Sequence, residues 1–325
     1  MNHSAEGMIR TVLGDMPADR LGRCDYHEHL FQVSPLLPGD ELDNEFASRS
    51  EAATLRAAGV AAMVEATPTG LGRRPAAVAR ISVLTGLAVV HVTGGHRHEH
   101  YPAGHWLPEA SEADLADRFT ADIVDGLPEH DTRDRGAHAH APHGERVRAG
   151  LVKAGVGYWR IDPFERRVLA AAAAAAGRTG AAVMVHLEHG SAAWEVLTAL
   201  AGDGVRPDRV VLAHADRNLD PGLHIELTRA GAYLGYDGMA RHREAPDSAI
   251  LDCLARVAAD GDPARLLLGG DVARASRYRG YGGLPGLDYL PVRFVPRVLA
   301  RLGAELTEQL LTGNPARLLA LRAPS

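Results

Sequence analysis

The feature that most restricts the fold of this chain is a repeated alternation of short apolar runs with helical segments. Runs rich in Val, Ile, Leu and Ala, a composition typical of buried parallel strands, occur at residues 23–30, 60–66, 88–93, 149–156, 182–187, 209–215, 232–236 and 266–271. Amphipathic or alanine-rich segments lie between them and predict helices, for example at 112–124, 163–176, 192–201, 248–258 and 292–302.

About eight strand–helix repeats predict an α/β fold, and specifically a single-domain (β/α)8 TIM barrel. A doubly wound open sheet is the alternative, but no glycine-rich nucleotide turn follows the first strand. The 325 residues, 46% of them hydrophobic, suffice for one large barrel over residues 1–325, and no break in composition marks a second domain. Residues 129–147 are rich in His and lack apolar periodicity, so we expect an exposed, mobile insertion there.

Composition excludes several classes of function. The net charge of −6 and the pI of about 6.3 argue against a nucleic-acid binder or a protein that binds anionic membranes. The two cysteines, Cys24 and Cys253, are far apart and form no disulfide framework, which fits a reducing cytoplasm. Residues 1–16 lack an apolar signal core, and no stretch is long and apolar enough to span a bilayer. We therefore expect a cytoplasmic protein that acts on a small molecule.

Lys153 is the only lysine of the chain, and every other residue in the Lys and Arg count is Arg. It lies in the apolar run at 149–156, where an unpaired ammonium group would be costly. A desolvated lysine can lose its proton, which arginine does not do. The neutral amine can then act as a nucleophile, or add carbon dioxide to form a carbamate that bridges two metal ions. A salt-bridging or surface lysine is the alternative interpretation.

Potential metal ligands lie where the predicted strands end, and in a TIM barrel that end carries the chemistry. His27 and His29 are two residues apart on one strand, so both side chains should leave on the same face. The His-x-His pattern alone is weak, because it recurs at 96/98, 98/100 and 138/140. Further candidates end later strands: His186, His214 and Asp271. Together with Lys153 they predict two divalent metal ions, with zinc the default and manganese, cobalt or iron as alternatives.

These motifs, in this order, resemble the phosphotriesterase-like group of the amidohydrolase superfamily. The motifs are His27-Glu28-His29, the strand with Lys153, Val185-His186, Ala213-His214-Ala215-Asp216 and Gly270-Asp271-Val272-Ala273-Arg274. The resemblance covers nearly the whole chain, from residues 11–14 to 313–317.

The resemblance implies a binuclear metal hydrolase, and the family suggests a homodimer. The more buried ion would be held by His27, His29 and Asp271, the more exposed one by His186 and His214, with Lys153 as a carbamate bridging both beside a hydroxide. Asp271 would also accept the proton as the hydroxide attacks.

Two loops bear on the substrate. Residues 236–243 and 274–283 together carry Arg241, Arg243, Arg274, Arg277 and Arg279, a local positive charge in an acidic protein. The second loop resembles the branch that includes lactonases for phosphorylated sugars. We therefore expect hydrolysis of a lactone or ester with an anionic group, contacted by Arg274 and Arg241; ordinary solvated arginines are the alternative.

The loop after residue 93 offers further substrate contacts, among them His98 and Tyr101; the alternative is that most of its side chains are surface residues. Because aromatic residues make up only 5% of the chain, a large apolar pocket for a neutral phosphotriester is not expected. The alternatives are a phosphotriesterase, an amidase or deaminase on a related barrel, and a non-catalytic metal-binding barrel.

Overall fold

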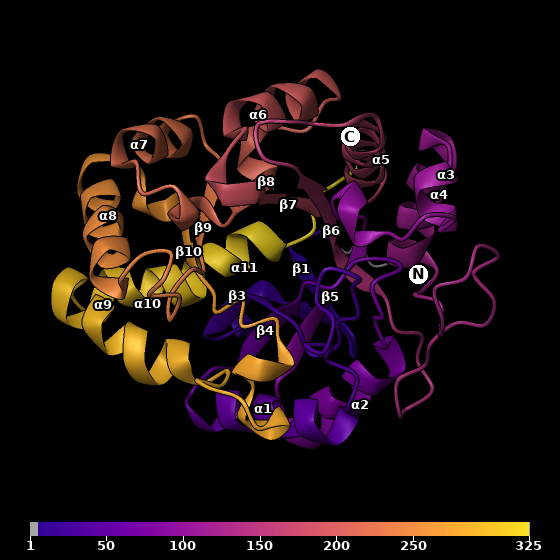
Figure 1. Ribbon diagram of the computed structural model, residues 1–325, viewed down its shortest axis with the longest axis horizontal. Coiled ribbons are helices and arrows are strands. Elements are labelled where there is room, and N and C mark those ends of the chain that lie inside the picture. The colour runs from indigo at the N-terminus through magenta and orange to yellow at the C-terminus, as the bar shows by residue number, and fades with distance from the viewer. Residues whose placement is uncertain (1–5, 325) are drawn as a thin grey trace.

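A computed structural model describes residues 6–324, and an eight-stranded parallel sheet stands at its centre (Figure 1). The strands pair in sequence order, each with the next: β3 (Cys24–Glu28), β4 (Ala62–Glu65), β5 (Ala88–Gly94), β6 (Ala149–Val156), β7 (Ala182–Leu187), β8 (Val210–Ala213), β9 (Tyr233–Tyr236) and β10 (Leu266–Leu268). The backbone N–H of Asp271, just beyond β10, donates to the carbonyl oxygen of His27 in β3 at 2.9 Å. This contact brings the last strand to the first, and the predicted barrel is confirmed.

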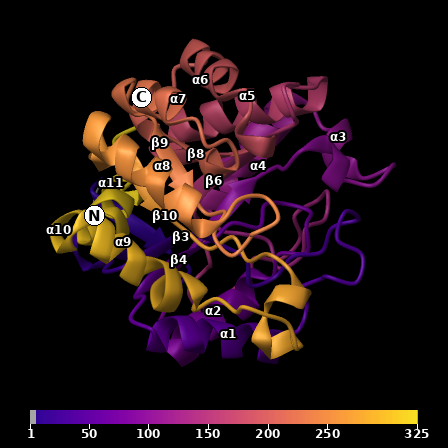
Figure 2. The same ribbon diagram turned by 60° about the vertical axis from the view of Figure 1, so that its left-hand side comes forward.

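The helices surround these strands, most of them in a ring and the last, α11, across the middle of the view in Figure 1 (Figures 1 and 2). They are α1 (Glu45–Ala57), α2 (Pro75–Thr85), α3 (Trp106–Glu109), α4 (Glu112–Val124), α5 (Pro163–Thr179), α6 (Ala193–Gly202), α7 (Pro221–Arg229), α8 (Asp247–Asp260), α9 (Val295–Leu302), α10 (Ala304–Glu308) and α11 (Asn314–Leu319). Capping boxes begin α4 at Ser111 and α5 at Asp162, where a side chain satisfies an otherwise unpaired N–H group.

The sequence pattern located the elements well, and their ends less well. The predicted strands at 149–156 and 182–187 and the helix at 112–124 agree residue for residue. The strand predicted at 266–271 ends at Leu268, and Asp271 adopts a positive φ of 41° that strand pairing does not allow. The helix predicted at 292–302 starts as a π-helical turn, Leu290–Phe294. An antiparallel hairpin of β1 (Met8–Thr11) and β2 (Gly14–Pro17) was not predicted.

Side chains of the strands alternate between two buried layers. On β6, Leu151 packs inside the barrel, whereas Val152 and Ala154 pack between strands and helices. Lys153 lies between the last two in sequence, so it points inward like Leu151. The only lysine amine of the chain, on an otherwise apolar strand, therefore lies inside the barrel.

A β-bulge interrupts this alternation on β3. Asp25 pairs with Met63 and Glu28 with Glu65, so three steps on β3 face two steps on β4. The extra residue lets both Tyr26 and His27 face the barrel interior. The bulge thus turns the His27 side chain toward the strands that follow in sequence, while every residue of β3 stays buried.

Most side chains of residues 129–147 are exposed, but the segment is tied to the barrel. The Asp131 carboxylate accepts hydrogen bonds from Arg73 Nε at 2.8 Å, Arg73 Nη2 at 2.7 Å and the backbone N–H of Gly70 at 2.8 Å. Arg135 pairs with Asp122 at the same junction. The histidines of this segment form no group that could hold a metal ion among the residues the structure describes.

Both cysteines are buried and unpaired, as expected. Within residues 6–324, none of the helices has the length and apolar character needed to cross a bilayer.

Candidate metal centre

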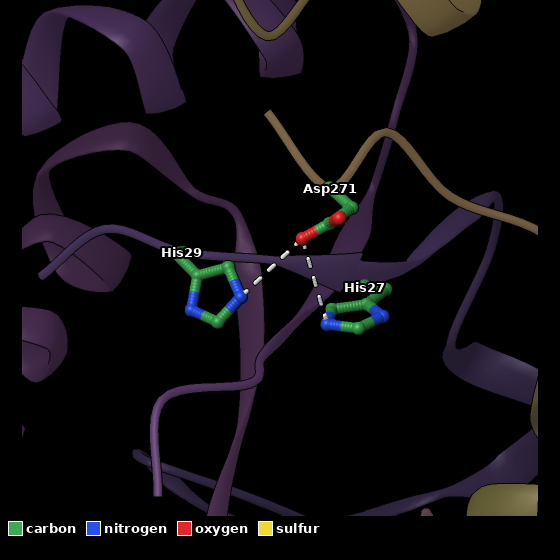
Figure 3. A group of neighbouring side chains, drawn as sticks. All are labelled: His27, His29 and Asp271. Atoms are coloured by element: carbon green, nitrogen blue, oxygen red, sulfur yellow. Dashed lines mark ion pairs between the residues drawn. The ribbon is translucent and has the colours of Figure 1, made fainter. Parts of the chain in front are cut away.

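Three predicted ligands meet at the end of the barrel where β3 and β10 come together (Figure 3). His27 Nε2 and His29 Nε2 face the same carboxylate oxygen, Asp271 Oδ1, at 3.8 Å and 3.6 Å. All three side chains are buried. Although His29 lies one residue beyond β3, its ring still converges with that of His27, and the ring centroids are 5.4 Å apart.

The spacing of these atoms suits a cation between them. Two ligand atoms bound at about 2.1 Å to a tetrahedral zinc ion are roughly 3.4 Å apart. The separations of 3.6 and 3.8 Å are close to that value, and they are too long for hydrogen bonds. Buried nitrogen and oxygen donors of this kind are borderline to hard ligands, as zinc, manganese, cobalt and iron prefer.

Lys153 lies beside this group and is almost completely buried. Its Nζ donates to His27 Nε2 at 3.1 Å and contacts Met184 Sδ at 3.3 Å, and the structure gives it no carboxylate partner within residues 6–324. Burial lowers the pKa of Lys153 to about 8, although Asp271 and Asp237 act in the opposite direction. Burial therefore increases the neutral fraction of the amine near physiological pH, and the neutral amine is the form that adds carbon dioxide.

Asp237, which the sequence analysis missed, holds two of the imidazoles. It is fully buried directly after β9, where it accepts from His214 Nδ1 at 2.7 Å, from His27 Nδ1 at 3.1 Å and from the hydroxyl of Tyr26. These are hydrogen-bond distances, so Asp237 fixes the tautomer and leaves the lone pair of Nε2 as the one that can bind a cation, although Nε2 of His27 accepts from Lys153 Nζ here. Thr67 does the same for His29, since its Oγ1 accepts from His29 Nδ1 at 2.7 Å and donates to the carbonyl of Phe31.

His186 and His214 form the second predicted pair, with ring centroids 4.5 Å apart. His186 is on β7, and His214 follows β8 with a positive φ of 64°, which turns its ring toward the barrel axis. His186 Nε2 donates to Glu188 Oε2 at 2.8 Å, so its Nδ1 is the nitrogen left for a metal. Glu188 is a second residue that the sequence analysis missed.

The electrostatics keep the imidazoles neutral, as metal binding requires. Burial lowers the pKa of His27 to about 4 and that of His214 to about 3, and it also lowers the pKa values of His29 and His186. Burial alone would raise the pKa of Asp271, but Arg241 and His214 outweigh it and hold that pKa well below its usual value. The carboxylate is thus charged when the imidazoles are not.

The two oxygens of Asp271 have different partners. Oδ1 faces His27 and His29, whereas Oδ2 accepts from Arg241 Nη2 at 2.7 Å and from Arg217 Nη2 at 3.0 Å. Arg241 also donates to the backbone carbonyl of Asp271. Its Nη1 is buried and has no hydrogen-bond partner within residues 6–324. Arg217 is a further residue that sequence reasoning did not identify.

The four residues predicted to bind substrate lie in different places. Arg241 and Arg274 line a cavity of about 180 Å³ that contains the metal ligands, and Arg274 approaches Asp40 at 3.8 Å. His98 and Tyr101 instead line a neighbouring, larger cavity. The Tyr101 hydroxyl is already engaged, since it accepts from the N–H of His96 and donates to the carbonyl of Thr69.

Two other histidines of the same loop reach the candidate metal ligands. His96 and His100 are buried and line the small cavity, and the His96 ring lies 4.6 Å from that of His186. No sequence signal distinguished them from His98, because all three share the same His-x-His spacing.

Comparisons with known proteins agree with this geometry. The model of the phosphotriesterase family matches residues 7–319. A phospho-furanose lactonase of Mycoplasmopsis synoviae is 29% identical over 96% of this chain and 91% of its own length. An N-acetyltaurine hydrolase of Danio rerio is 28% identical over 97% of this chain and 99% of its own length.

Solved structures of similar proteins have the same fold. A lactonase from Listeria monocytogenes superposes with a TM-score of 0.87 at 27% identity, covering 97% of this chain and all of the other. An amidohydrolase from Mycoplasma synoviae gives a TM-score of 0.89 at 28% identity, covering 98% and 94% of the two chains. The fold, the buried His and Asp groups and the family match agree, and the chain belongs to the phosphotriesterase family of metal-dependent ester hydrolases.

Proposed function

We propose that this protein hydrolyses a lactone or ester that carries an anionic group, and that it uses two divalent metal ions held at the end of the barrel. His27, His29 and Asp271 would hold one ion and His186 and His214 the other, with the carbamate of Lys153 between them. Zinc is the default metal for this donor set, and manganese, cobalt and iron are alternatives.

The observation that carries the proposal is the position of Lys153. The only lysine of the chain is buried beside His27 Nε2, in the small cavity that the five other ligands line. A buried ammonium group without a carboxylate partner is costly, whereas a carbamate is an anion that suits two cations. The residues present therefore fit a binuclear site.

The ions would polarise the reacting carbonyl and acidify a water molecule. The residues of the chain perform the remaining tasks. Asp271 Oδ1 faces the ligand nitrogens and is the group placed to accept the proton, whereas Oδ2 is held by Arg217 and Arg241. Asp237 keeps the rings of His27 and His214 oriented.

The anionic group would lie at the side of the cavity formed by the loops after β9 and β10. Arg241 has a buried Nη1 free of partners among the described residues, and Arg274 lines the same cavity with a half-exposed side chain. Guanidinium groups bind phosphate and carboxylate in a bidentate manner. The relatives named as phospho-furanose lactonases support an anionic lactone, because their substrate carries a phosphate.

The test compares kcat/KM for one sugar lactone with and without its phosphate group, in the metal-loaded wild type and in R274A. Loss of one charge-assisted contact should reduce the preference for the phosphorylated lactone by about 10- to 100-fold. The matched control is R279A, because Arg279 lies in the same loop but pairs with Asp288 at 2.8 Å. That variant should keep the wild-type preference.

Four results would contradict the proposal. An unchanged preference in R274A would remove the anionic contact. Faster turnover of a neutral aryl phosphotriester than of any lactone would favour an organophosphate hydrolase. Turnover of amides without lactones would favour an amidase, and a metal-loaded protein inert toward all these classes would indicate a binding protein.

A further inference from the structure

A second cavity, of about 1570 Å³, adjoins the metal centre. It lies between the loops that follow β5, β6, β7 and β8, and it shares Arg97, Glu188 and Arg217 with the small cavity. Ligand pockets usually measure about 300–1,000 Å³, so the small cavity of about 180 Å³ has room for the reacting group and a small anionic group, but not for a larger substrate. The rest of a larger substrate would extend into the second cavity.

One wall of the second cavity is aromatic. Tyr158 and Trp159 are 61% and 62% exposed there, in a chain with only 5% aromatic residues. Tyr158 stands edge-on to Trp159, with centroids 6.4 Å apart, and edge-on to His189 at 5.7 Å. Large rings left open to solvent at the rim of a cavity present faces that a flat ligand can cover.

The loop that carries these rings is held in a strained conformation. Trp159 has a φ of 48°, a region that bulky residues rarely adopt. The backbone N–H of Trp159 donates to Ser191 Oγ at 3.0 Å, and Ser191 Oγ donates to the carbonyl of Glu188 at 2.7 Å. Such strain costs on the order of 1–3 kcal/mol and persists where the surroundings fix it. The backbone that carries the rings is thus held in one conformation, which reduces the entropy lost on binding.

The charges around this cavity are balanced. Four arginines (Arg97, Arg160, Arg167, Arg217) face five carboxylates (Glu99, Glu109, Asp162, Glu165, Glu188). The guanidinium of Arg167 is engaged with the carbonyls of Pro108 and Pro163. The charges of the lining therefore do not favour a charged ligand, in contrast to the arginine-rich side near Arg241 and Arg274. Recognition here would rest on the rings.

We propose that the second cavity binds an aromatic ring of the substrate, which stacks on Trp159 and Tyr158. The substrate would have two ends: an anionic group on the side of β9 and β10, and a flat ring on the side of β5 to β8, with the reacting carbonyl between them. The inference rests on the proposed function for the position of the carbonyl, but ring binding itself can be measured without turnover.

The binding experiment uses the full-length, metal-loaded protein with W106F and W194F, which leaves Trp159 as the single tryptophan of the original three. Benzyl alcohol and cyclohexylmethanol serve as probes of similar size. Benzyl alcohol should change the fluorescence of Trp159 saturably, and at about 2- to 10-fold lower concentration than cyclohexylmethanol, the range that ring stacking contributes. Equal effects of both probes, or none, would overturn the ring subsite.

The kinetic experiment compares γ-phenyl and γ-cyclohexyl butyrolactone as substrates. The ratio of their kcat/KM values is the readout, because a general loss of activity cancels from it. The wild type should favour the phenyl lactone by about 2- to 10-fold, W159L should bring the ratio near one, and W159F should restore part of it. W194L is the control, because exposed Trp194 on α6 does not line this cavity, and it should keep the wild-type ratio.

The two hypotheses fail in different ways. Saturable binding of benzyl alcohol without turnover of any lactone would contradict the proposed function and leave the ring subsite standing. Turnover of lactones with the same ratio in the wild type and W159L would contradict the ring subsite and leave the proposed function standing.

Discussion

At the scale of single residues, the site is defined by which nitrogen of each imidazole already makes a hydrogen bond. The sequence singled out the candidate ligands, because each follows or ends an apolar run. It did not reveal that Asp237 orients His27 and His214, since those hydrogen bonds join residues 210 and 23 positions apart. A signal was present: Asp237 directly follows the apolar run at 232–236, as Asp271 follows its own run.

Replacing Asp237 with Asn should weaken metal binding. The amide has one acceptor oxygen in place of two, so at least one imidazole loses its partner. Loss of such an outer partner typically costs about 10- to 100-fold in metal affinity, measured here by titration of metal-free protein with zinc. T67V, which frees only His29 Nδ1, should show a smaller loss. Wild-type affinity in D237N would contradict the orienting role.

The free energy of unfolding of the metal-free protein should depend on whether the buried Lys153 amine carries a proton. The pKa of Lys153 is about 8 when folded and 10.5 ordinarily, so between these pH values the unfolded chain binds a proton that the folded chain does not. The free energy of unfolding should therefore rise as the pH rises between these two values. At lower pH the folded protein carries the full cost of burying the charged amine.

The K153M variant isolates this effect, because the chain has no other lysine. Without metal, K153M should be more stable than the wild type at pH 7, by a few kcal/mol, and the gap should narrow by pH 10. Urea unfolding in the presence of a chelator measures both values. A gap that stays the same at the two pH values would mean that Lys153 keeps its ordinary pKa.

At the scale of elements, the strands were predictable and their irregularities were not. The pattern of residues 149–156 predicted β6, and the alternation along that strand places Lys153 inside the barrel. The bulge on β3 and the attachment of residues 129–147 depend on pairings with distant residues, for which the local sequence carries no periodicity. The buried ion pair between Asp131 and Arg73 is the clearest such case.

Removing that ion pair should destabilise the protein. D131N leaves the guanidinium of Arg73, only 1% exposed, with the remaining partner Asp122. Breaking a buried pair from one side costs about 3–5 kcal/mol, measured by chemical unfolding. D117N is the control, because the Arg178–Asp117 pair is 50% and 75% exposed and should contribute at most about 1 kcal/mol. Equal losses in both variants would show that Asp131 does not anchor this segment.

At the scale of the whole molecule, closure of the barrel is what assembles the site. The candidate ligands are spread from His27 to Asp271, and the contact between the ends of β3 and β10 brings the first beside the last. The alternation of strands and helices predicted this fold, and the fold predicts that strand ends meet at one rim. The cavities and the arginine pairings at Asp271 required the three-dimensional arrangement.

The most direct test of the central claim is the metal content of the purified protein, measured by mass spectrometry for the wild type and K153A. Two ions per chain are expected for the wild type, and K153A should lose at least one ion and nearly all hydrolytic activity. Short carboxylic acids that replace the carbamate should restore part of both. Two ions and full activity in K153A would contradict a metal-bridging role for Lys153.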